Sequence, residues 1–448
     1  MRILPLLLVA AAAATASFSM AQDCSATWDY TVGTPGASSG YVGAFTLYQG
    51  DLVVSGSFPL MAGVPSTQYL ARYNRTTNAW SSFGQGLGSG ISNAFGTSFE
   101  HFNGDLIVGG FFADAEGVAD TKSIARWDGT QFHSLGTGWP FNTVNAVWSL
   151  LTSDAIGGQD RLYIGGGFDN IAGQPAGCIA MWDGTTLTPL ASSMTLVGIN
   201  PLVMCMATFD DGQGGGTQLY IGGRFSAVNG VPANMIARWN GSTWSAVGSN
   251  LTPRFASAEI DSLLVYNDGT GPALYAGGIN LRVNADGINR ANVKWNGTTW
   301  TAVGQALTGR TWTMAAWDDG NGEKLYAGGT QAGVGYIYRL DSGTWTSYGG
   351  GANAQVIKLL TEGDTMYVGG SIATVNGQPT GRIVSRVACE SCGCAADYNA
   401  DGGVNGTDVE AFFNDWEAAA GCSDVNQDGG ITGDDIGAFF EVWEAGGC

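Results

Sequence analysis

The segment Leu219-Tyr-Ile-Gly-Gly223 is the clearest copy of a motif that decides the fold, an apolar strand ending in a pair of glycines. Copies of it stand at residues 52–56, 106–110, 162–166, 219–223, 274–278, 325–329 and 366–370. The last residues of successive copies are separated by 54, 56, 57, 55, 51 and 41 positions. Each interval is long enough for four short strands with turns, so the chain is a repeat protein.

The remainder of each unit follows a common order, shown by the copy that continues from Gly223. A second apolar strand, Ala237-Arg-Trp239, is followed by Asn240-Gly241, a pair that supplies the positive φ angles of a tight hairpin. The next strand runs from Trp244 to a closing Gly248. Each unit therefore contains an inner strand, the glycine-pair strand, an aromatic strand and an outer strand, which is the composition of a propeller blade. We expect an all-β fold with seven blades.

The two ends of the repeat region complement each other. The seventh unit has no outer strand, because the chain passes from residues 383–387 directly to Cys389, whereas residues 27–33 copy the outer-strand pattern but precede the first unit. We predict that this N-terminal strand completes the seventh blade and closes the ring, which leaves no open sheet edge. Because Cys24 directly precedes that strand and Cys389 follows its expected partner, the same geometry predicts a disulfide between them.

The glycine pair, the aromatic residue 16 or 17 positions later and the second Trp resemble the kelch-type propeller repeat, most closely at Tyr73 to Trp80. The resemblance covers roughly residues 24–388. It implies a fold and no particular chemistry, because propellers of this type include oxidases, lyases, adhesins and scaffold proteins.

Composition and the N-terminus restrict the setting. Among 448 residues there are 71 Gly and 18 Lys plus Arg, and the net charge of −20 disfavours binding to nucleic acid or to an anionic membrane surface. Residues 1–21 have the layout of a secretory signal peptide, with Arg2, an apolar run and Ser19-Met20-Ala21. That run is too short for a transmembrane anchor. We expect a secreted, extracellular or cell-surface protein in which disulfides form.

Candidate catalytic groups are few. The two histidines, His101 and His133, are too few for a His-rich copper or zinc centre. Acidic pairs recur between the inner and glycine-pair strands at 210–211, 267–268 and 318–319, where Asp, Asn and Gly favour turns. We assign no catalytic residue. Cys178 and Cys205 are interpreted as buried thiols, with a disulfide between them as the alternative.

Binding residues are expected in the loops that lead from an outer strand into the next inner strand. These loops gather on one face around the central channel of a propeller, and aromatic and Arg side chains dominate binding patches. The alternative is that the Trp residues fill the channel. The candidate ligand-binding face consists of Trp139, Phe141, Arg254, Arg310 and Trp312.

The C-terminal residues 389–448 differ in composition, with thirteen acidic residues and no Lys or Arg. Two segments, 397–408 and 424–435, place oxygen-bearing residues at positions 1, 3, 5, 9 and 12 of a calcium loop, with Gly at position 6. Each leads into an expected helix, at 409–417 and 436–444, on which Phe, Phe and Trp share one face. The predicted ligands are Asp397, Asn399, Asp401, Gly403, Asn405, Asp408, Asp424, Asn426, Asp428, Gly430, Thr432 and Asp435.

This pair of loop and helix units resembles the dockerin type I domain, in the variant with flanking Gly-Cys pairs found at the C-terminus of some secreted bacterial proteins. The resemblance implies two bound calcium ions and attachment to a cohesin-like or other surface anchoring protein. Positions 10 and 11 of the loops, which commonly contact cohesin, read Gly406-Thr407 and Gly433-Asp434 instead of the frequent Ser-Thr pair.

The sequence therefore predicts a signal peptide at 1–21, a propeller at 22–388 and a calcium-binding module at 389–448. The favoured function is that of a secreted, non-catalytic binding or display protein with a glycan or protein ligand. One alternative is an extracellular carbohydrate-active enzyme, a glycoside hydrolase or lyase, that uses acidic, Arg or Tyr loop residues. Another is a purely structural surface protein without a ligand.

Overall fold

A computed structural model of the chain describes residues 26–88, 94–136, 146–171 and 173–388, together with 396, 398, 404–417, 423, 425 and 432–445. These residues divide into two compact units between Ala388 and Cys389. No helix within the described ranges is long and apolar enough to cross a membrane. The predicted signal peptide and the predicted disulfide between Cys24 and Cys389 lie outside the described residues.

The unit of residues 26–388 is built from antiparallel strands and one short 3-10 helix, η1 (Thr31–Gly33), which confirms the expected β structure. Its inner strands are β2 (Tyr41–Tyr48), β6 (Phe95–Phe102), β10 (Val147–Ser153), β17 (Leu202–Phe209), β24 (Glu259–Asn267), β28 (Arg310–Asp318) and β32 (Val356–Glu362). The second strands, which carry the glycine pairs, are β3 (Asp51–Ser57), β7 (Asp105–Phe111), β11 (Arg161–Gly166), β18 (Gln218–Arg224), β25 (Pro272–Val283), β29 (Glu323–Gln331) and β33 (Thr365–Gly370).

The third strands are β4 (Leu70–Asn74), β8 (Ile124–Trp127), β14 (Ile179–Trp182), β21 (Ile236–Trp239), β26 (Arg290–Trp295), β30 (Val334–Asp341) and β36 (Ile383–Val387). The outer strands are β5 (Ala79–Ser82), β9 (Phe132–His133), β15 (Leu187–Pro189), β22 (Trp244–Ala246), β27 (Trp300–Ala302), β31 (Thr344–Ser347) and β1 (Thr27–Asp29). Short strands extend the loops: β12 (Asn170–Ile171), β13 (Gln174–Pro175), β16 (Met194–Thr195), β19 (Ala227–Val228), β20 (Val231–Pro232), β23 (Leu251–Pro253), β34 (Thr374–Val375) and β35 (Gln378–Pro379).

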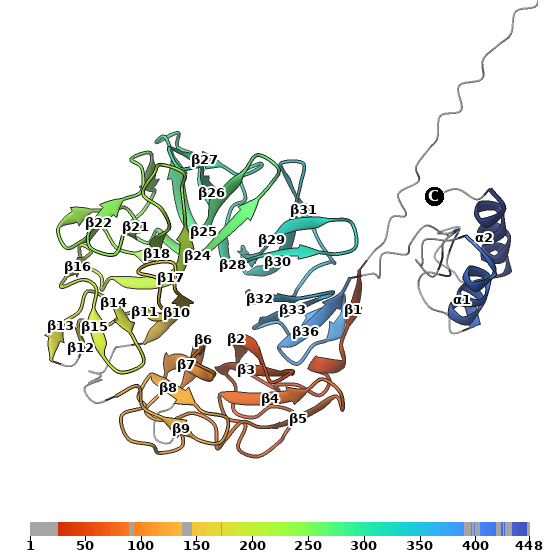
Figure 1. Cartoon of the computed structure of the whole chain (residues 1–448), viewed down its shortest axis with the longest axis horizontal. Helices are drawn as coiled ribbons and strands as arrows, with labels where there is room; N and C mark the ends of the chain where they lie inside the picture. The colour runs from red at the N-terminus through yellow and green to blue at the C-terminus, as the bar shows by residue number, and fades with distance from the viewer. Residues whose placement is uncertain are drawn as a thin grey trace, which may run out of the picture. The chain divides into compact units, whose positions relative to one another are not determined.

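The strands pair in the order inner, second, third and outer within every set of four. Two of the sets, β24 to β27 and β28 to β31, join into one larger sheet through a single bridge between Ile279 and Arg310. Each inner strand contacts the inner strand of the next set, and β32 contacts β2. The inner strands accordingly lie nearest the middle of the unit (Figure 1).

The N-terminal strand pairs where the sequence predicted. β1 is antiparallel to β36, with Trp28 opposite Arg386, so the sheet of the last repeat takes its outer strand from the start of the chain. The predicted strand over residues 27–33 is nevertheless too long. The chain turns after Asp29, whose Oδ1 accepts the Thr31 N–H at 2.8 Å, and Thr31–Gly33 form η1.

The two glycines of each pair have different structural reasons. A Cβ on the first glycine would collide with the next inner strand, as at Gly165, where it would lie 2.6 Å from Val203 Cγ1. A Cβ on the second glycine would overlap a carbonyl oxygen of its own inner strand, as Gly278 would overlap that of Glu259. The first glycine therefore permits close packing between sheets, and the second permits a close approach within one sheet.

One repeat departs from the pair and compensates for it. Ser55 stands where other repeats have the first glycine, and the facing position of the next inner strand is Gly96 instead of a branched residue. At this contact the glycine therefore lies on the inner strand of the next set instead of on the second strand. Between the last set and the first, Gly369 faces Phe45 and Val42, so the usual arrangement also occurs there.

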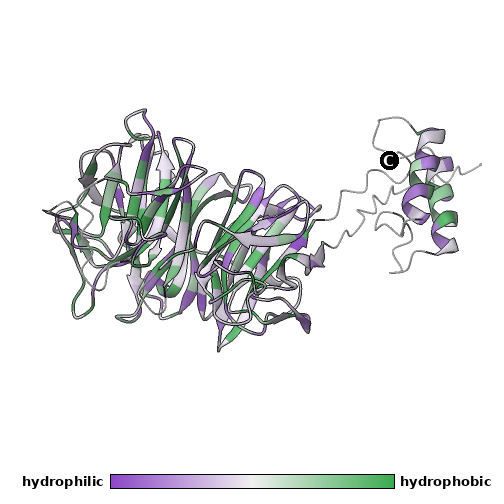
Figure 2. Ribbon diagram, turned by 90° about the horizontal axis from the view of Figure 1, so that it is seen from below, coloured by the Kyte–Doolittle hydropathy of each residue, from purple (hydrophilic) through white to green (hydrophobic). Residues whose placement is uncertain are grey.

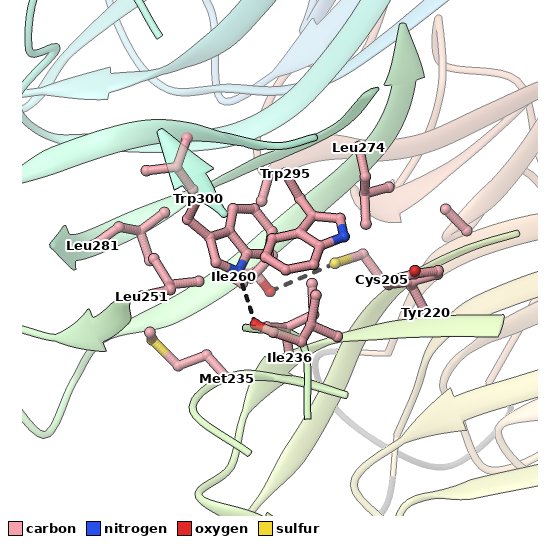
Figure 3. Close-up of a cluster of buried hydrophobic side chains, with 14 of the residues drawn as sticks. Cys205, Tyr220, Met235, Ile236, Leu251, Ile260, Leu274, Leu281, Trp295 and Trp300 are labelled. Atoms are coloured by element: carbon pink, nitrogen blue, oxygen red, sulfur yellow. Dashed lines mark hydrogen bonds between the residues drawn. The ribbon is translucent and has the colours of Figure 1, made fainter. Parts of the chain in front are cut away.

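Tryptophans on the outer strands connect neighbouring sheets. Their indole N–H groups donate to carbonyl oxygens of the preceding set, at 2.9 Å from Trp244 to Leu190 and 2.8 Å from Trp300 to Val247. Figure 3 shows Trp300 packed with Trp295 in the core between two sheets. Trp28 of the N-terminal strand makes the same contact, donating to the Gly349 carbonyl at 2.6 Å. Hydrophobic residues recur along the strands of this unit (Figure 2), and the buried ones form clusters that join neighbouring sheets.

In the C-terminal unit the described residues form two helices, α1 (Gly406–Glu417) and α2 (Gly433–Ala445). Their buried rings Phe412 and Phe439 stack with centroids 4.1 Å apart. Trp416 of α1 donates to the Thr432 carbonyl before α2 at 2.9 Å, and Trp443 of α2 donates to the Asn405 carbonyl before α1 at 3.2 Å. Each helix is therefore hydrogen-bonded to the segment that precedes the other helix.

Both helices begin three residues before the predicted starts. Asp408 accepts the Asn405 N–H at 2.7 Å, and Asn405 in turn accepts the Thr407 N–H at 3.0 Å. Asp435 likewise accepts the Thr432 N–H at 2.7 Å. This is a capping-box arrangement, so the last positions of each loop already form the first helical turn.

Candidate functional site

Every inner strand contains one β-bulge, and the bulged residues share a single location. The pairing register between inner and second strand shifts by one residue in each of the seven sets. A bulge leaves an extra residue unpaired and re-aims its side chain. All of these residues line one cavity of about 400 Å³: Gly43, Thr97, Trp148, Met204, Asp261, Trp312 and Ile357.

The cavity combines aromatic and charged side chains. Trp148, Trp312 and Tyr41 contribute rings, and the charged residues are Arg224, Glu259, Asp261, Arg310 and Lys358. Pockets for small molecules usually measure about 300–1,000 Å³ and are mostly apolar with a few convergent polar groups. The cavity agrees with this description at its smaller end.

Arg310 is the centre of the charged wall. Its guanidinium donates to both carboxylate oxygens of Asp261, at 2.9 and 2.6 Å, and forms an ion pair with Glu259. The same group lies 3.4 Å above the ring centre of Trp312, which fixes its plane. Arg224 stands 3.7 Å from Glu259. Two cations thus balance two carboxylates.

Burial is the main influence on the pKa of Asp261. Its carboxylate is only 2% exposed, and loss of hydration raises the pKa of Asp261 well above the usual range. Arg310 lowers this pKa and Glu259 raises it. Substitution of Arg310 would therefore leave two carboxyl groups in a desolvated wall with Arg224, 3.7 Å from Glu259, as the remaining cation of this wall.

Several hydrogen-bond donors in this region have no acceptor. Trp312 Nε1 and Arg224 Nε are buried without a hydrogen-bond partner. The Lys358 amine on β32 forms no hydrogen bond or ion pair with the residues that the structure describes. Burial lowers the pKa of Lys358, while Glu100 acts in the opposite direction. Trp312 Nε1 and Arg224 Nε are inaccessible from the cavity, whereas Lys358 is not fully buried, so its amine is the donor that an added group could reach.

The predicted binding residues divide into three groups. Arg310 and Trp312 do line the cavity, but they belong to strand β28 and not to a loop. Arg254 is exposed, covers Phe255 at 5.3 Å and does not line the cavity. Trp139 and Phe141 lie outside the described residues. Trp148, Asp261, Arg224 and Lys358 were not predicted.

The acidic pairs are turn residues, as predicted. Asp210 accepts the Gly212 N–H at 3.0 Å, and Asp318 accepts the Gly320 N–H at 2.9 Å. The second acid of each pair bonds to a basic residue of the third strand, as in the 2.6 Å contact between Arg339 and Asp319. The resulting ladder comprises Asp51–Arg72, Asp105–Arg126, Asp211–Arg238, Asp268–Lys294 and Asp319–Arg339.

The histidines and internal cysteines have structural surroundings. His101 contacts the Leu47 carbonyl at 3.0 Å, and His133 lies 2.7 Å from Asp128. Cys178 and Cys205 are buried free thiols, and burial raises the pKa of Cys178 to about 12. A thiol that stays protonated at neutral pH is a poor nucleophile.

The calcium loops are described only at their ends. Asn405, Asp408, Thr432 and Asp435 belong to the part of the chain that the structure describes. Within that part, no group of three or more His, Cys, Asp or Glu residues is placed so that it could hold a metal ion. Asp408 and Asp435 are fully buried carboxyl residues. The remaining predicted ligands lie outside the described residues: Asp397, Asn399, Asp401, Gly403, Asp424, Asn426, Asp428 and Gly430.

Comparisons with known proteins give structural neighbours only. No protein family and no curated protein matches the chain. A computationally designed protein, Ika8, is 11% identical, with 80% of this chain and 90% of that chain covered and a TM-score of 0.43. The extracellular domain of a B. thetaiotaomicron two component system is 13% identical over 81% and 39% of the two chains, with a TM-score of 0.48. Saccharomyces cerevisiae Sqt1 is 11% identical over 82% and 98%, with a TM-score of 0.41.

Proposed function

We propose that the chain is a secreted, non-catalytic binding protein whose seven-bladed propeller holds a small ligand in its central cavity. In this proposal a calcium-loaded, dockerin-like module attaches it to a cohesin-like or other anchoring partner outside the cell. The observation that carries the binding role is the convergence of all seven bulged residues on one cavity. Six of the seven repeats re-aim a side chain to this place, and the seventh contributes Gly43, which makes a site that packing alone does not require.

The ring closure in this proposal rests on contacts between the two ends of the repeat region. β32 contacts β2, Gly369 faces Val42, and Trp28 bonds to the Gly349 carbonyl. Trp80 of the first set donates to the Val32 carbonyl, just after the N-terminal strand, at 3.1 Å. These are the same kinds of contact that join the other neighbouring sets.

Binding is favoured over catalysis because the two carboxylates of the cavity, Glu259 and Asp261, are paired with the same arginine. Glycoside hydrolysis needs two carboxyl groups in separate roles, one as acid and one as base or nucleophile. Here Glu259 and Asp261 share the Arg310 guanidinium. The raised pKa of Asp261 is the observation in favour of the alternative, a carbohydrate-active enzyme with a general acid in this cavity.

A glycan array and a reducing-end assay on the same preparations test both readings. The wild type should bind one class of saccharide without releasing new reducing ends. Trp148→Ala, which removes a cavity ring, should lose that binding, whereas Arg254→Ala outside the cavity should keep it. Release of reducing ends that is abolished in Asp261→Asn would favour the enzyme, and array binding that survives Trp148→Ala would contradict the cavity as the site.

The calcium role rests on the buried Asp408 and Asp435 at position 12 of each loop. Each of these carboxylates accepts a backbone N–H of its own loop, and calcium prefers carboxylate and carbonyl oxygens as ligands. Calorimetry on the full chain should detect two calcium ions, and Asp408→Ala should bind one. The exposed Glu410→Ala on the same helix is the matched control. A wild type without calcium uptake at millimolar concentration would refute this part.

A further inference from the structure

The hydrogen-bonding groups of the cavity are unequally matched. Its two acidic residues, Glu259 and Asp261, are already engaged by Arg310 and Arg224. Among the described residues, Trp312 Nε1 and Arg224 Nε have no hydrogen-bond partner, but both atoms are buried within the wall and not accessible from the cavity. The Lys358 amine also has no partner there and its residue is partly exposed, so it is the donor that a ligand with acceptor atoms can reach.

Lys358 adds a third positive charge to the cavity lining, and Glu100, which acts on it electrostatically, does not line the cavity. It is one of only 18 basic residues in a chain of net charge −20, and three of those 18 line this cavity. The Leu359 N–H donates to Thr313 Oγ1 at 3.2 Å, which holds the Lys358 strand against the strand that carries Arg310 and Trp312. Because both carboxylates of the wall are already neutralised, the positive charge of Lys358 calls for an anion.

Another part of the cavity lining is aromatic. Phe95 lies 5.8 Å from Trp148 and 6.3 Å from Tyr41 between ring centres, so both rings are held in place from behind. Gly43 and Gly96 add no side chains to this part of the lining. Aromatic rings beside polar groups suit a ligand ring that has one apolar face and several hydroxyls.

We propose that the ligand of the cavity is an anionic saccharide of one or two rings, whose acid group is held by the Lys358 amine. Its ring lies against Trp148 and Tyr41. The proposal rests on the binding role assigned to the cavity above and adds the charge and size of the ligand. The volume of about 400 Å³ sets the size, because it is small for a drug-sized molecule.

Calorimetry on the full chain with defined sugars tests this assignment. The probes are galacturonate and digalacturonate, the neutral galactose, and galactose 6-sulfate, which distinguishes a carboxylate from a sulfate as the acid group. At least one acidic sugar should bind at least about tenfold more tightly than galactose, the gain expected from a charge-assisted hydrogen bond. Equal binding of acidic and neutral sugars, or no binding of any acidic sugar at 10 mM, about the weakest affinity of interest, would overturn it.

Lys358→Met separates the role in binding from a role in folding. Because it removes a poorly solvated, unpaired cation, it should raise the melting temperature without ligand while abolishing the preference for acidic sugars. Lys324→Met removes the same charge outside the cavity and should change neither. An unaltered preference in Lys358→Met would contradict the proposal. If a neutral saccharide binds and is lost in Trp148→Ala, the binding role stands and only the anionic assignment fails.

Discussion

Trp28 gives the most direct test of how the last sheet is completed. Its indole N–H donates to the Gly349 carbonyl at 2.6 Å, and its ring lies 4.9 Å from the Arg386 guanidinium. Trp28→Phe removes the donor and keeps most of the ring. Loss of one such hydrogen bond lowers the free energy of unfolding by about 1 kcal/mol. Trp28→Ala also removes the packing of a half-buried ring, for a total of about 3 kcal/mol.

The expected shifts in melting temperature follow from the size of the unit. An unfolding entropy of about 2.1 cal/mol/K per residue, over roughly 360 residues, gives a shift of about 1 °C for Trp28→Phe and about 4 °C for Trp28→Ala. Trp300→Phe is the matched control, because Trp300 makes the equivalent 2.8 Å bond to Val247 inside the repeat region. Differential scanning calorimetry should give similar losses for the two Phe variants. A Trp28→Ala variant with the wild-type melting temperature would refute the idea that the N-terminal strand completes the last sheet.

Four further results are expected. Gly165→Ala, whose Cβ would lie 2.6 Å from Val203, should lower the free energy of unfolding by about 1–3 kcal/mol, whereas Gly351→Ala, with open space around it, should change it little in chemical denaturation. The Thr186 N–H and Thr185 lower the pKa of Asp183 to about 2, so its stabilising contribution is present above about pH 4 and is lost as the pH falls towards 2; Asp183→Asn should lose part of that acid dependence in melts at pH 2–6. Chelation of calcium should increase hydrogen exchange in residues 404–417 and 432–445 and leave residues 26–388 unchanged; exchange that is unaffected would contradict the metal assignment. Peptide mapping without reduction should recover Cys24 joined to Cys389, and a partner of Cys24 other than Cys389 or Cys392 would contradict the predicted pairing.

Features with a strictly local cause could be predicted from the sequence. The glycine pair indicates two places where backbone or side chains of another strand come close. Asn240-Gly241 and the corresponding pairs of other repeats indicate tight turns, so strand order within a repeat could be inferred without the structure. The prediction that the strand at Trp28 replaces the missing outer strand of the last repeat needed only a count of the strands in each repeat. The turn role of Asp210 and Asp318 followed for the same reason, because Asp at such a position bonds to the next N–H groups.

The site could not be predicted in the same way, because it depends on a break in the strand pattern. Alternation of side chains would place Trp312 and Thr313 on opposite faces, but the bulge at Trp312 sends this residue into the cavity. Trp312 was selected for its chemistry and assigned to a loop, whereas Trp148 and Asp261 gave no signal of their own. The residues before these bulges are Val147, Ile260 and Thr311, all β-branched, and that local pattern could have indicated the positions.

The two glycines also explain how the repeat separates its scaffold from its site. The second glycine approaches the carbonyl of the residue two places before the bulge, as Gly278 does with Glu259, so the bulge is built from backbone contacts. The side chain of the bulged residue takes no part in this backbone approach, and among the bulged residues Thr97 is the one whose hydroxyl donates to carbonyl oxygens of neighbouring strands, those of Gly109 and Val147. The bulged residue can therefore range from Gly43 to Trp148 without disturbing its sheet, and each repeat contributes an independent choice to one cavity. Unlike the bulged residues, the residues that join neighbouring sheets must fit their partners. This is why Ser55 in one sheet faces Gly96 in the next. A change of ligand in this architecture would alter bulged residues first and leave the glycine pairs intact.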